Sequence, residues 1–170
     1  EHLARADIFM LTKSNIGSKN LHWIRQRLFS IKPDAVIFEA VHKPIQFMDF
    51  KRNRYLPLQD LKGKRVAVIS GIGDPYSFEQ TIEGLGAEIV FAARFDDHHP
   101  YKESELKEFV ARCKEVSVKE VITTEKDFYR LEPLLKKKRS HELQHLSFLA
   151  LQIDFQVDDE EDFIRRCLRP

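Results

Sequence analysis

The residues most able to do chemistry lie in one short segment, Asp96-Asp97-His98-His99-Pro100-Tyr101. An imidazole takes up or releases a proton near neutral pH, and imidazoles beside carboxylates can also hold a metal ion. Metal binding alone is the less attractive of the two, because the sequence shows no second cluster of His, Asp or Glu with the spacing of metal ligands. Two surface histidines in a loop closed by Pro100 would give the same pattern.

Two further segments combine turn residues with polar side chains. The first is Ser70-Gly71-Ile72-Gly73-Asp74-Pro75, and the second is Thr123-Thr124-Glu125-Lys126-Asp127. The glycines can form a tight turn that needs backbone freedom, and a dinucleotide site is a weak interpretation because the third glycine of that fingerprint is missing. Lys126 can be a solvated cation and Asp127 a helix cap, or both can line a site.

The apolar pattern indicates which elements position these three segments. Short apolar runs alternate with helical spacings, which predicts an α/β fold with a mostly parallel sheet and flanking helices. Strands are expected at residues 8–11, 35–38, 65–70, 87–95, 118–123 and 146–155. Each polar segment follows one of these strands, and ligands bind beyond the carboxyl ends of parallel strands. We therefore expect all three segments to meet at one edge of the sheet.

Several helix boundaries can also be predicted. Asp74 is placed to cap a helix that has Pro75 in its first turn and Gly86 as its stop. Asp127 is placed to cap another helix. The acidic residues 158–162 open a last helix, with charges that favour a helix N-terminus. The side chains expected to face inward from this last helix are Phe163, Ile164, Cys167 and Leu168.

Composition excludes several classes of protein. The 170 residues hold 28 Lys and Arg against 27 Asp and Glu, a formal net charge of +1 that gives no electrostatic case for nucleic-acid binding. No apolar run approaches the ~20 residues that span a bilayer. The two cysteines, Cys113 and Cys167, are far apart and lack the CxxC spacing, so we expect reduced, half-buried thiols. Because the chain opens on Glu1 and enters an apolar run almost at once, we expect a piece of a longer polypeptide.

The three polar segments share their order and spacing with a known family. They read Gly-Ile-Gly-Asp-Pro-Tyr-Ser-Phe at 71–78, Phe-Asp-Asp-His-His-Pro-Tyr at 95–101 and Thr-Thr-Glu-Lys-Asp at 123–127. Together they resemble the C-terminal half of tetraacyldisaccharide 4'-kinase, the lipid A kinase of Gram-negative bacteria. The resemblance is strong over residues 61–131, weaker before them and essentially absent after residue 136.

The resemblance implies a P-loop-type kinase that uses ATP and Mg²⁺ to phosphorylate the 4'-hydroxyl of tetraacyldisaccharide 1-phosphate in lipid A biosynthesis. It implies two α/β lobes joined by a β-ribbon, peripherally attached to the cytoplasmic face of the bacterial inner membrane. The Walker A loop, the magnesium-binding carboxylates and the membrane-associating helix belong to the family's N-terminal half, and no G-x-x-x-x-G-K-[ST] occurs here. We therefore expect that half to be this chain's partner and to bind ATP and Mg²⁺, and we expect this chain alone to be inactive.

The same resemblance assigns domains and site residues. Residues 1–60 would be the end of the preceding lobe plus a ribbon or linker, and residues 61–170 the C-terminal α/β lobe. His98 matches the family's catalytic histidine, which partners an aspartate from the other half. Asp97 and His99 would orient that imidazole or neighbouring substrate groups. No residue is assigned to a metal. The residues expected to line the cleft are Gly71, Gly73, Asp74, His99, Thr124, Glu125, Lys126 and Asp127.

The chain departs from the family pattern at two places, and two other functions remain open. Asp96 stands where the family commonly has proline, and Phe128-Tyr129-Arg130 stands where smaller residues and lysine are commoner. Asp97-His98-His99 could instead belong to a DHH-type metal-dependent phosphoesterase, although the further aspartate motifs of a two-metal site are not clear. A non-catalytic module that binds a nucleotide or another anion at the 71–74 turn is the third interpretation.

Overall fold

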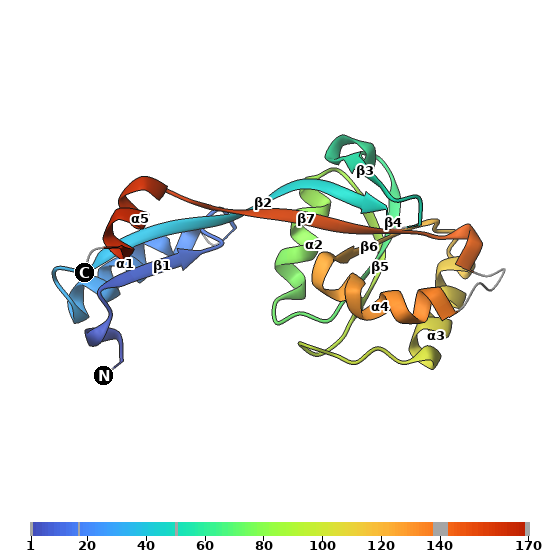
Figure 1. The fold of residues 1–170 in the computed structure, drawn as a ribbon, viewed down its shortest axis with the longest axis horizontal. Coiled ribbons are helices and arrows are strands. Elements are labelled where there is room, and N and C mark those ends of the chain that lie inside the picture. Colours follow the sequence, from blue (N-terminus) through green and yellow to red (C-terminus); the bar gives the residue numbers. More distant parts are fainter. Residues whose placement is uncertain (1, 17, 50, 138–142, 169–170) are drawn as a thin grey trace. The chain divides into compact units, whose positions relative to one another are not determined.

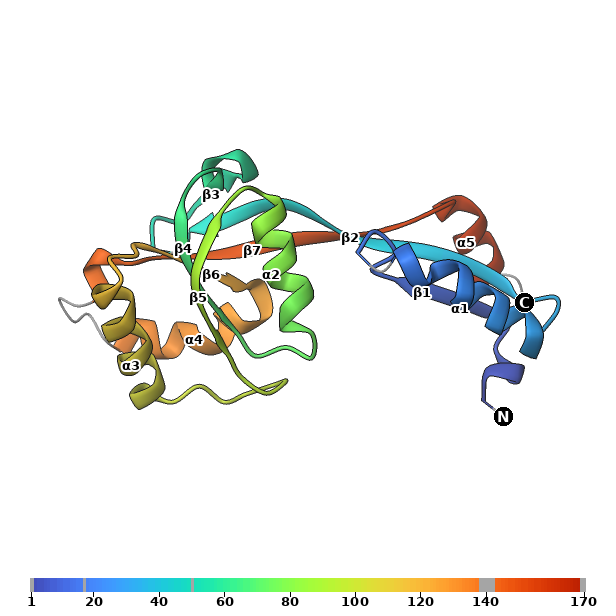
Figure 2. The same cartoon turned by 180° about the vertical axis from the view of Figure 1, so that it is seen from behind.

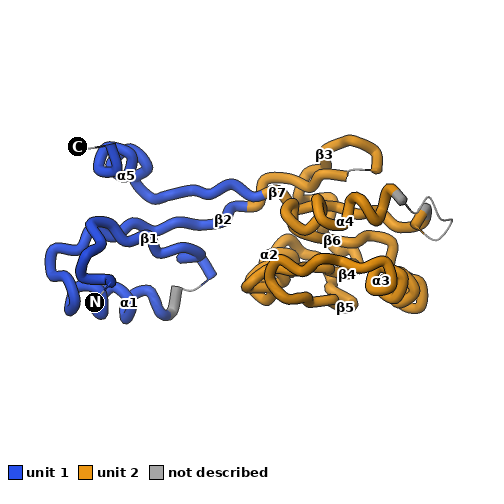
Figure 3. Tube along the Cα trace, turned by 60° about the horizontal axis from the view of Figure 1, so that its bottom comes forward, with its two compact units in different colours: residues 1–43, 153–170 blue, residues 44–152 orange. Residues whose placement is uncertain are grey.

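The computed structural model describes residues 2–16, 18–49, 51–137 and 143–168. Apart from short 3₁₀ turns, its elements (Figure 1) are β1 (Ile8–Thr12), α1 (Ser18–Ile31), β2 (Val36–Asp49), β3 (Arg54–Pro57), β4 (Arg65–Ser70), α2 (Pro75–Gly84), β5 (Glu88–Arg94), α3 (Glu103–Glu115), β6 (Glu120–Thr124), α4 (Glu125–Lys137), β7 (Ser147–Val157) and α5 (Glu160–Cys167). The chain divides into two compact units, residues 1–43 with 153–170 and residues 44–152 (Figure 3).

The unit of residues 44–152 is built on a parallel sheet. Strands β7, β6, β4 and β5 lie in that order, and each neighbouring pair is parallel. Successive residues of a strand point to opposite faces, so β4 contributes to two cores. Ala67 and Ile69 pack with α3 and α4, whereas Val66 and Val68 pack with Phe78 of α2. Figures 1 and 2 show the unit from opposite sides. The predicted α/β fold with a mostly parallel sheet is confirmed.

The unit of residues 1–43 and 153–170 has a parallel β1–β2 pair, in which Ile8 lies opposite Val36. Helix α5 packs on this pair through an edge-to-face contact between Phe38 and Phe163, whose ring centroids are 5.3 Å apart. The carboxylate of Asp158 accepts a hydrogen bond from the backbone N–H of Glu39 at 2.6 Å. The start of α5 is therefore tied to the middle of β2.

Strand β2 is much longer than the strand predicted at 35–38. Its first part pairs with β1 as far as Ala40, and its last part pairs antiparallel with β3 from Gln46 onward. Pro44 lies between these two pairings, so its missing N–H removes no bond to either strand. The loose pattern after residue 41, which we interpreted as a ribbon or linker, is thus the second half of β2 with the β3 hairpin.

The compact units differ from the predicted domains at 1–60 and 61–170. The first unit ends at Lys43, and the chain returns to it at Ile153. The difference arises because β2 and β7 each run from one unit into the other, so that the last helix joins the N-terminal segment. A division of the chain by sequence position alone cannot show that residues 153–170 belong to the same unit as residues 1–43.

The last helix is less buried than its sequence predicts. Phe163 packs on Phe38, but Ile164 and Leu168 are 47% and 76% exposed, so the expected inward face is wrong at these positions. The thiols also differ from the expectation of two half-buried groups, since Cys113 is fully buried and Cys167 is exposed. Both are free thiols, and burial raises the pKa of Cys113 to about 12.

No described helix combines the length and the apolar character needed to cross a membrane.

The core of the larger unit should be sensitive to loss of volume at Ile122, which is 0% exposed in the middle of β6. Ile122→Ala should lower the free energy of unfolding by about 2–5 kcal/mol, and Ile122→Val by about 0.5–1.5 kcal/mol, because the cavity grows with the atoms removed. Urea unfolding measures both. An Ile122→Ala loss as small as that of an exposed substitution such as Leu168→Ala would contradict the packing described here.

Candidate functional site

The three polar segments meet at the carboxyl edge of the parallel sheet, as expected. The loop after β5 is tied to the turn after β4 by two backbone hydrogen bonds, from Phe95 N to Ser70 O at 2.8 Å and from His98 N to Gly71 O at 3.2 Å. The turn after β4 is tied in the same way to the start of α4, since Gly71 N donates to Asp127 Oδ2 at 3.1 Å. The chemistry-bearing residues therefore lie on segments that hold one another.

Asp127 is the centre of these contacts and is 0% exposed. Besides the bond from Gly71, it accepts one from Thr124 Oγ1 at 2.7 Å and one from Arg130 Nη1 at 3.2 Å. Helix α4 begins at Glu125, and Thr124 Oγ1 accepts the N–H of Asp127 at 3.0 Å. Thr124 thus caps the helix, and the prediction of Asp127 as its cap is wrong. The Asp127 carboxylate instead reaches the neighbouring turn.

Gly71 is required by close packing. A Cβ atom at this position would lie 3.0 Å from Tyr101 Oη and 3.2 Å from the Asp96 carbonyl oxygen, tighter than ordinary contacts. It would also lie 3.3 Å from Asp127 Oδ1. Gly73 is different, because its nearest neighbour would be Asp97 Oδ2 at 3.7 Å. The first glycine of the turn therefore lets the β5 loop and Asp127 approach, whereas the second has room.

Asp74 acts as the predicted helix cap. It is the N-cap residue of α2, and its Oδ1 accepts a hydrogen bond from Ser77 N at 3.1 Å. Its Oδ2 accepts one from Ser77 Oγ at 2.5 Å. Pro75 occupies the first turn of the helix, where its missing N–H costs nothing. The carboxylate is therefore used in holding the start of α2.

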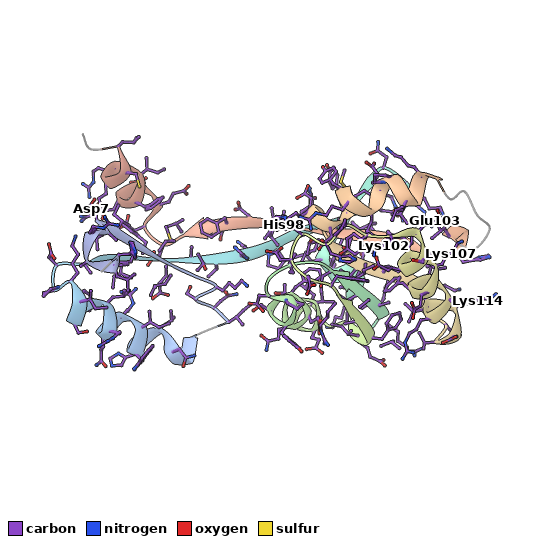
Figure 4. All side chains as sticks on the ribbon, turned by 90° about the horizontal axis from the view of Figure 1, so that it is seen from below. Asp7, His98, Lys102, Glu103, Lys107 and Lys114 are labelled. Atoms are coloured by element: carbon purple, nitrogen blue, oxygen red, sulfur yellow. The ribbon has the colours of Figure 1, made fainter. Side chains whose placement is uncertain are left out.

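His98 lies in the loop between β5 and α3 (Figure 4), with its side chain 66% exposed. Its φ of 64° is left-handed, a region in which histidine is enriched among residues other than glycine. Its Nδ1 lies 2.8 Å from Arg130 Nη2, and its Nε2 lies 3.4 Å from Lys126 Nζ. Asp97 Oδ2 is 3.8 Å from the same Nε2. A solvent-facing imidazole is thus surrounded by two cations and one carboxylate.

His99 is separated from this group in spite of its position in the sequence. Its ring stacks on Phe95, with centroids 4.6 Å apart, and its Nε2 lies 2.9 Å from Glu105 Oε2. The same Glu105 oxygen accepts a hydrogen bond from Lys102 N at the start of α3, at 2.8 Å. These two bonds, that of His99 first, lower the pKa of the Glu105 carboxyl. His99 therefore holds the loop against α3.

Glu125 also lies apart from His98 in its contacts. Its Oε1 accepts a hydrogen bond from Gln152 Nε2 at 3.0 Å, and Gln152 Oε1 accepts one from Gln46 Nε2 at 2.8 Å. This chain of side chains links the start of α4 to β7 and β2. Of the predicted site residues, those that the structure joins by direct contacts around His98 and Asp127 are Gly71, Asp97, His98, Thr124, Lys126 and Asp127.

Two members of the cluster were not among the predicted site residues. Arg130 contacts His98, Asp127 and the Gly71 carbonyl oxygen, the last at 3.3 Å. Its place three residues after Asp127, on the same face of a helix, was the available signal. The phenol of Tyr101 is held near the Asp127 carboxylate, and burial, followed by that charge, raises its pKa above the ordinary value. Tyr101 ends the motif at 95–101, but no role was predicted for it.

Comparisons with known proteins place the chain in a family. The family model of tetraacyldisaccharide-1-P 4'-kinase (LpxK) matches residues 1–169. A tetraacyldisaccharide 4'-kinase of Syntrophus aciditrophicus is 39% identical over 127 residues, which cover 75% of this chain and 32% of the relative. One of Elusimicrobium minutum is 36% identical over 173 residues, which cover 99% of this chain and 43% of the relative.

The chain belongs to the tetraacyldisaccharide-1-P 4'-kinase family. It spans less than half the length of the two relatives above. Among solved structures, "apo" form LpxK from Aquifex aeolicus in complex with ATP is similar, with a TM-score of 0.47 and 19% identity over 95% of this chain and 52% of that one.

The two glycines of the β4–α2 turn should respond differently to the same change. Gly71→Ala should lower the free energy of unfolding by about 1–3 kcal/mol, because the added methyl group overpacks against Tyr101 and the Asp96 carbonyl oxygen. Gly73→Ala, the matched control, meets only an ordinary contact and should be close to neutral. Urea unfolding of the two variants measures the difference. Equal losses would mean that close approach at Gly71 does not explain its glycine.

Proposed function

We propose that this chain is the C-terminal part of an ATP-dependent kinase that phosphorylates the 4'-hydroxyl of tetraacyldisaccharide 1-phosphate in lipid A biosynthesis. Family membership supports the reaction class. The observation that carries the proposal is the exposed His98 imidazole, which stands at the carboxyl edge of the sheet with Lys126 and Arg130 at its two ring nitrogens. Ligands of open α/β sheets bind at this edge.

His98 is the group that takes the proton from the acceptor hydroxyl. As the O–H bond breaks, the proton passes to a ring nitrogen and the oxygen keeps the electron pair with which it attacks the γ-phosphorus of ATP. The bond from that phosphorus to the oxygen bridging it to the β-phosphate breaks, and ADP leaves. Asp97, whose Oδ2 is 3.8 Å from Nε2, supports the positive charge that the ring acquires. In the same proposal, an aspartate of the N-terminal half completes the pair.

The cations beside His98 suit a reaction at phosphate. Transfer of a phosphoryl group is accelerated mainly by positioning and by stabilising negative charge. Lys126 Nζ and the Arg130 guanidinium lie at the carboxyl edge of the sheet, where this negative charge would develop. Neither an ammonium nor a guanidinium group can accept a proton from the substrate, so neither replaces His98 as the base. We assign Lys126 to this role. Gly71, Thr124 and Asp127 position the edge, while Gly73, Asp74, His99 and Glu125 remain predicted lining residues.

In this proposal, ATP and Mg²⁺ are bound by the N-terminal half of the kinase and not by this chain. Its sequence has no G-x-x-x-x-G-K-[ST] loop, whose backbone amides and lysine cradle phosphates. Within the described residues, no group of three or more His, Cys, Asp or Glu side chains is arranged to hold a metal ion. We therefore assign ATP and Mg²⁺ to the N-terminal P-loop half, which is the proposed partner of this chain.

The proposed substrate also suggests where the protein works. Tetraacyldisaccharide 1-phosphate carries acyl chains and is held at a membrane surface, so the kinase would act as a peripheral protein on the cytoplasmic face of the bacterial inner membrane. Attachment would come from the N-terminal half. The DHH-type phosphoesterase is set aside because the chain belongs to a kinase family.

The assignment of the base can be tested in a kinase of full family length that contains this sequence. His98→Ala should lower kcat by about 10²–10⁴-fold, the usual contribution of a general base. The KM for ATP should change little, because the nucleotide is held elsewhere. His99→Ala is the matched control and should reduce kcat much less, since His99 contacts Phe95 and Glu105.

Steady-state kinetics with the lipid acceptor decide between the two histidines. Loss of turnover in His99→Ala with nearly normal kcat in His98→Ala would reverse the assignment within the pair. Normal kcat in both variants would remove the catalytic role from this segment altogether.

The assignment of ATP to the other half makes a separate prediction. Calorimetry of this chain alone with Mg-ATP should show no binding at micromolar concentration, because the loop that normally holds the phosphates is not in the sequence. A clear micromolar site on this chain would contradict the proposal and would point to the β4–α2 turn as an anion site.

A further inference from the structure

The contact between Arg130 and His98 restricts where the imidazole can carry its proton. Arg130 Nη2 lies 2.8 Å from His98 Nδ1, a normal hydrogen-bond distance. A guanidinium only donates hydrogen bonds and stays protonated in proteins. Nδ1 must therefore accept, so it has the lone pair and no proton while this bond is present.

The other ring nitrogen is then the protonated one. A neutral imidazole has one N–H, and with the lone pair on Nδ1 that proton is on Nε2. Asp97 Oδ2, at 3.8 Å from Nε2, is the nearby carboxylate on this side but is too far for a hydrogen bond, and Lys126 Nζ, at 3.4 Å, can only donate. Lys126 therefore makes no hydrogen bond to a protonated Nε2, and the short contact with Arg130 determines the tautomer.

Arg130 is well placed to impose this state because it is held at its other amino group. Nη1 donates to Asp127 Oδ1 at 3.2 Å and to the Gly71 carbonyl oxygen at 3.3 Å. Its side chain is only 23% exposed, whereas that of His98 is 66% exposed. The planar guanidinium is thus fixed on a buried carboxylate, and the exposed imidazole adapts to it.

We propose that Arg130 is a positioning residue for His98. Arg130 holds the His98 imidazole in the tautomer that has the lone pair on Nδ1 and the proton on Nε2. The catalytic part of this inference rests on the proposed function. It identifies Nδ1 of His98 as the nitrogen that accepts the proton of the acceptor hydroxyl. The acceptor hydroxyl must take the place of Arg130 Nη2 at Nδ1. The O–H proton then passes to Nδ1, and the resulting imidazolium presents Nε2–H to a carboxylate.

This displacement leaves Arg130 beside the reacting oxygen. Nη1 keeps its bonds to Asp127 and the Gly71 carbonyl oxygen, so the guanidinium stays at the edge after Nη2 gives up the ring nitrogen. A guanidinium at that place stabilises negative charge on phosphoryl oxygens. In this proposal Arg130 orients the base before the reaction, and its positive charge stays near the edge of the sheet while the phosphoryl group is transferred.

The tautomer can be measured on this chain without any activity. Long-range ¹H–¹⁵N correlation spectra of the histidine-labelled chain distinguish protonated from unprotonated ring nitrogens at a pH of about 8.5, above the ordinary titration range of imidazole. We expect the Nδ1 signal of His98 at the unprotonated limit. In Arg130→Met it should move toward the protonated position as both tautomers become populated, and Arg130→Lys should restore part of the shift. Arg112→Met, on an exposed arginine of α3 that contacts Phe91, should change nothing.

Each outcome decides the inference. A proton on Nδ1 in the unaltered chain, or an unchanged His98 spectrum in a folded Arg130→Met variant, would overturn it even if His98 is the base.

In the full-length kinase, Arg130→Met should lower kcat by about 10- to 100-fold, the cost of misplacing a catalytic group. The KM for ATP should change little, and Arg130→Lys should recover part of the loss. If His98→Ala kept full activity while the tautomer was as stated, the proposed function would fail and the inference about Arg130 would stand.

Discussion

The buried carboxylate of Asp127 is the interaction on which the rest of the site depends. Its two oxygens receive hydrogen bonds from the turn after β4, from the residue that caps α4, and from Arg130. A carboxylate that is 0% exposed is tolerated only when such donors replace water. Because these donors come from the turn after β4 and from the start of α4, the Asp127 side chain joins these two segments, which a hydrophobic residue of the same size could not do.

This arrangement separates support from chemistry. The supporting groups, Asp127 and Gly71, are buried, and Arg130 is mostly so. The groups that would meet a substrate, His98 and Lys126, are exposed. Exposure leaves the imidazole open to the proposed acceptor hydroxyl. The buried network gives the imidazole a defined orientation, which an exposed side chain on a loop does not have on its own. The left-handed backbone of His98 is consistent with a loop held by contacts from outside it.

Much of the fold and part of the candidate site could be predicted from the sequence. The features that could not be predicted depend on contacts between distant parts of the chain. The parallel sheet, the convergence of three segments and the Asp74 cap follow from local apolar patterns and cap residues. The length of β2 could not be predicted, because Pro44 suggests a break in the strand unless the strand pairing on either side of it is known. Nor could adjacency in sequence show that His98 faces solvent whereas His99 stacks on Phe95. The role of Arg130 depends on bonds to residues 32 and 59 positions away, which no local pattern reports.

The most direct test of this account is amide hydrogen exchange at Gly71 in Asp127→Asn. The substitution keeps the size of the side chain but replaces one accepting oxygen with an amino group and removes the charge. We expect the Gly71 N–H to lose protection by about 5- to 150-fold, which corresponds to about 1–3 kcal/mol for a buried donor without its partner. The exposed Asp60→Asn is the control and should leave it unchanged. Unaltered protection at Gly71 in Asp127→Asn would contradict the claim that this carboxylate joins the turn after β4 to the start of α4.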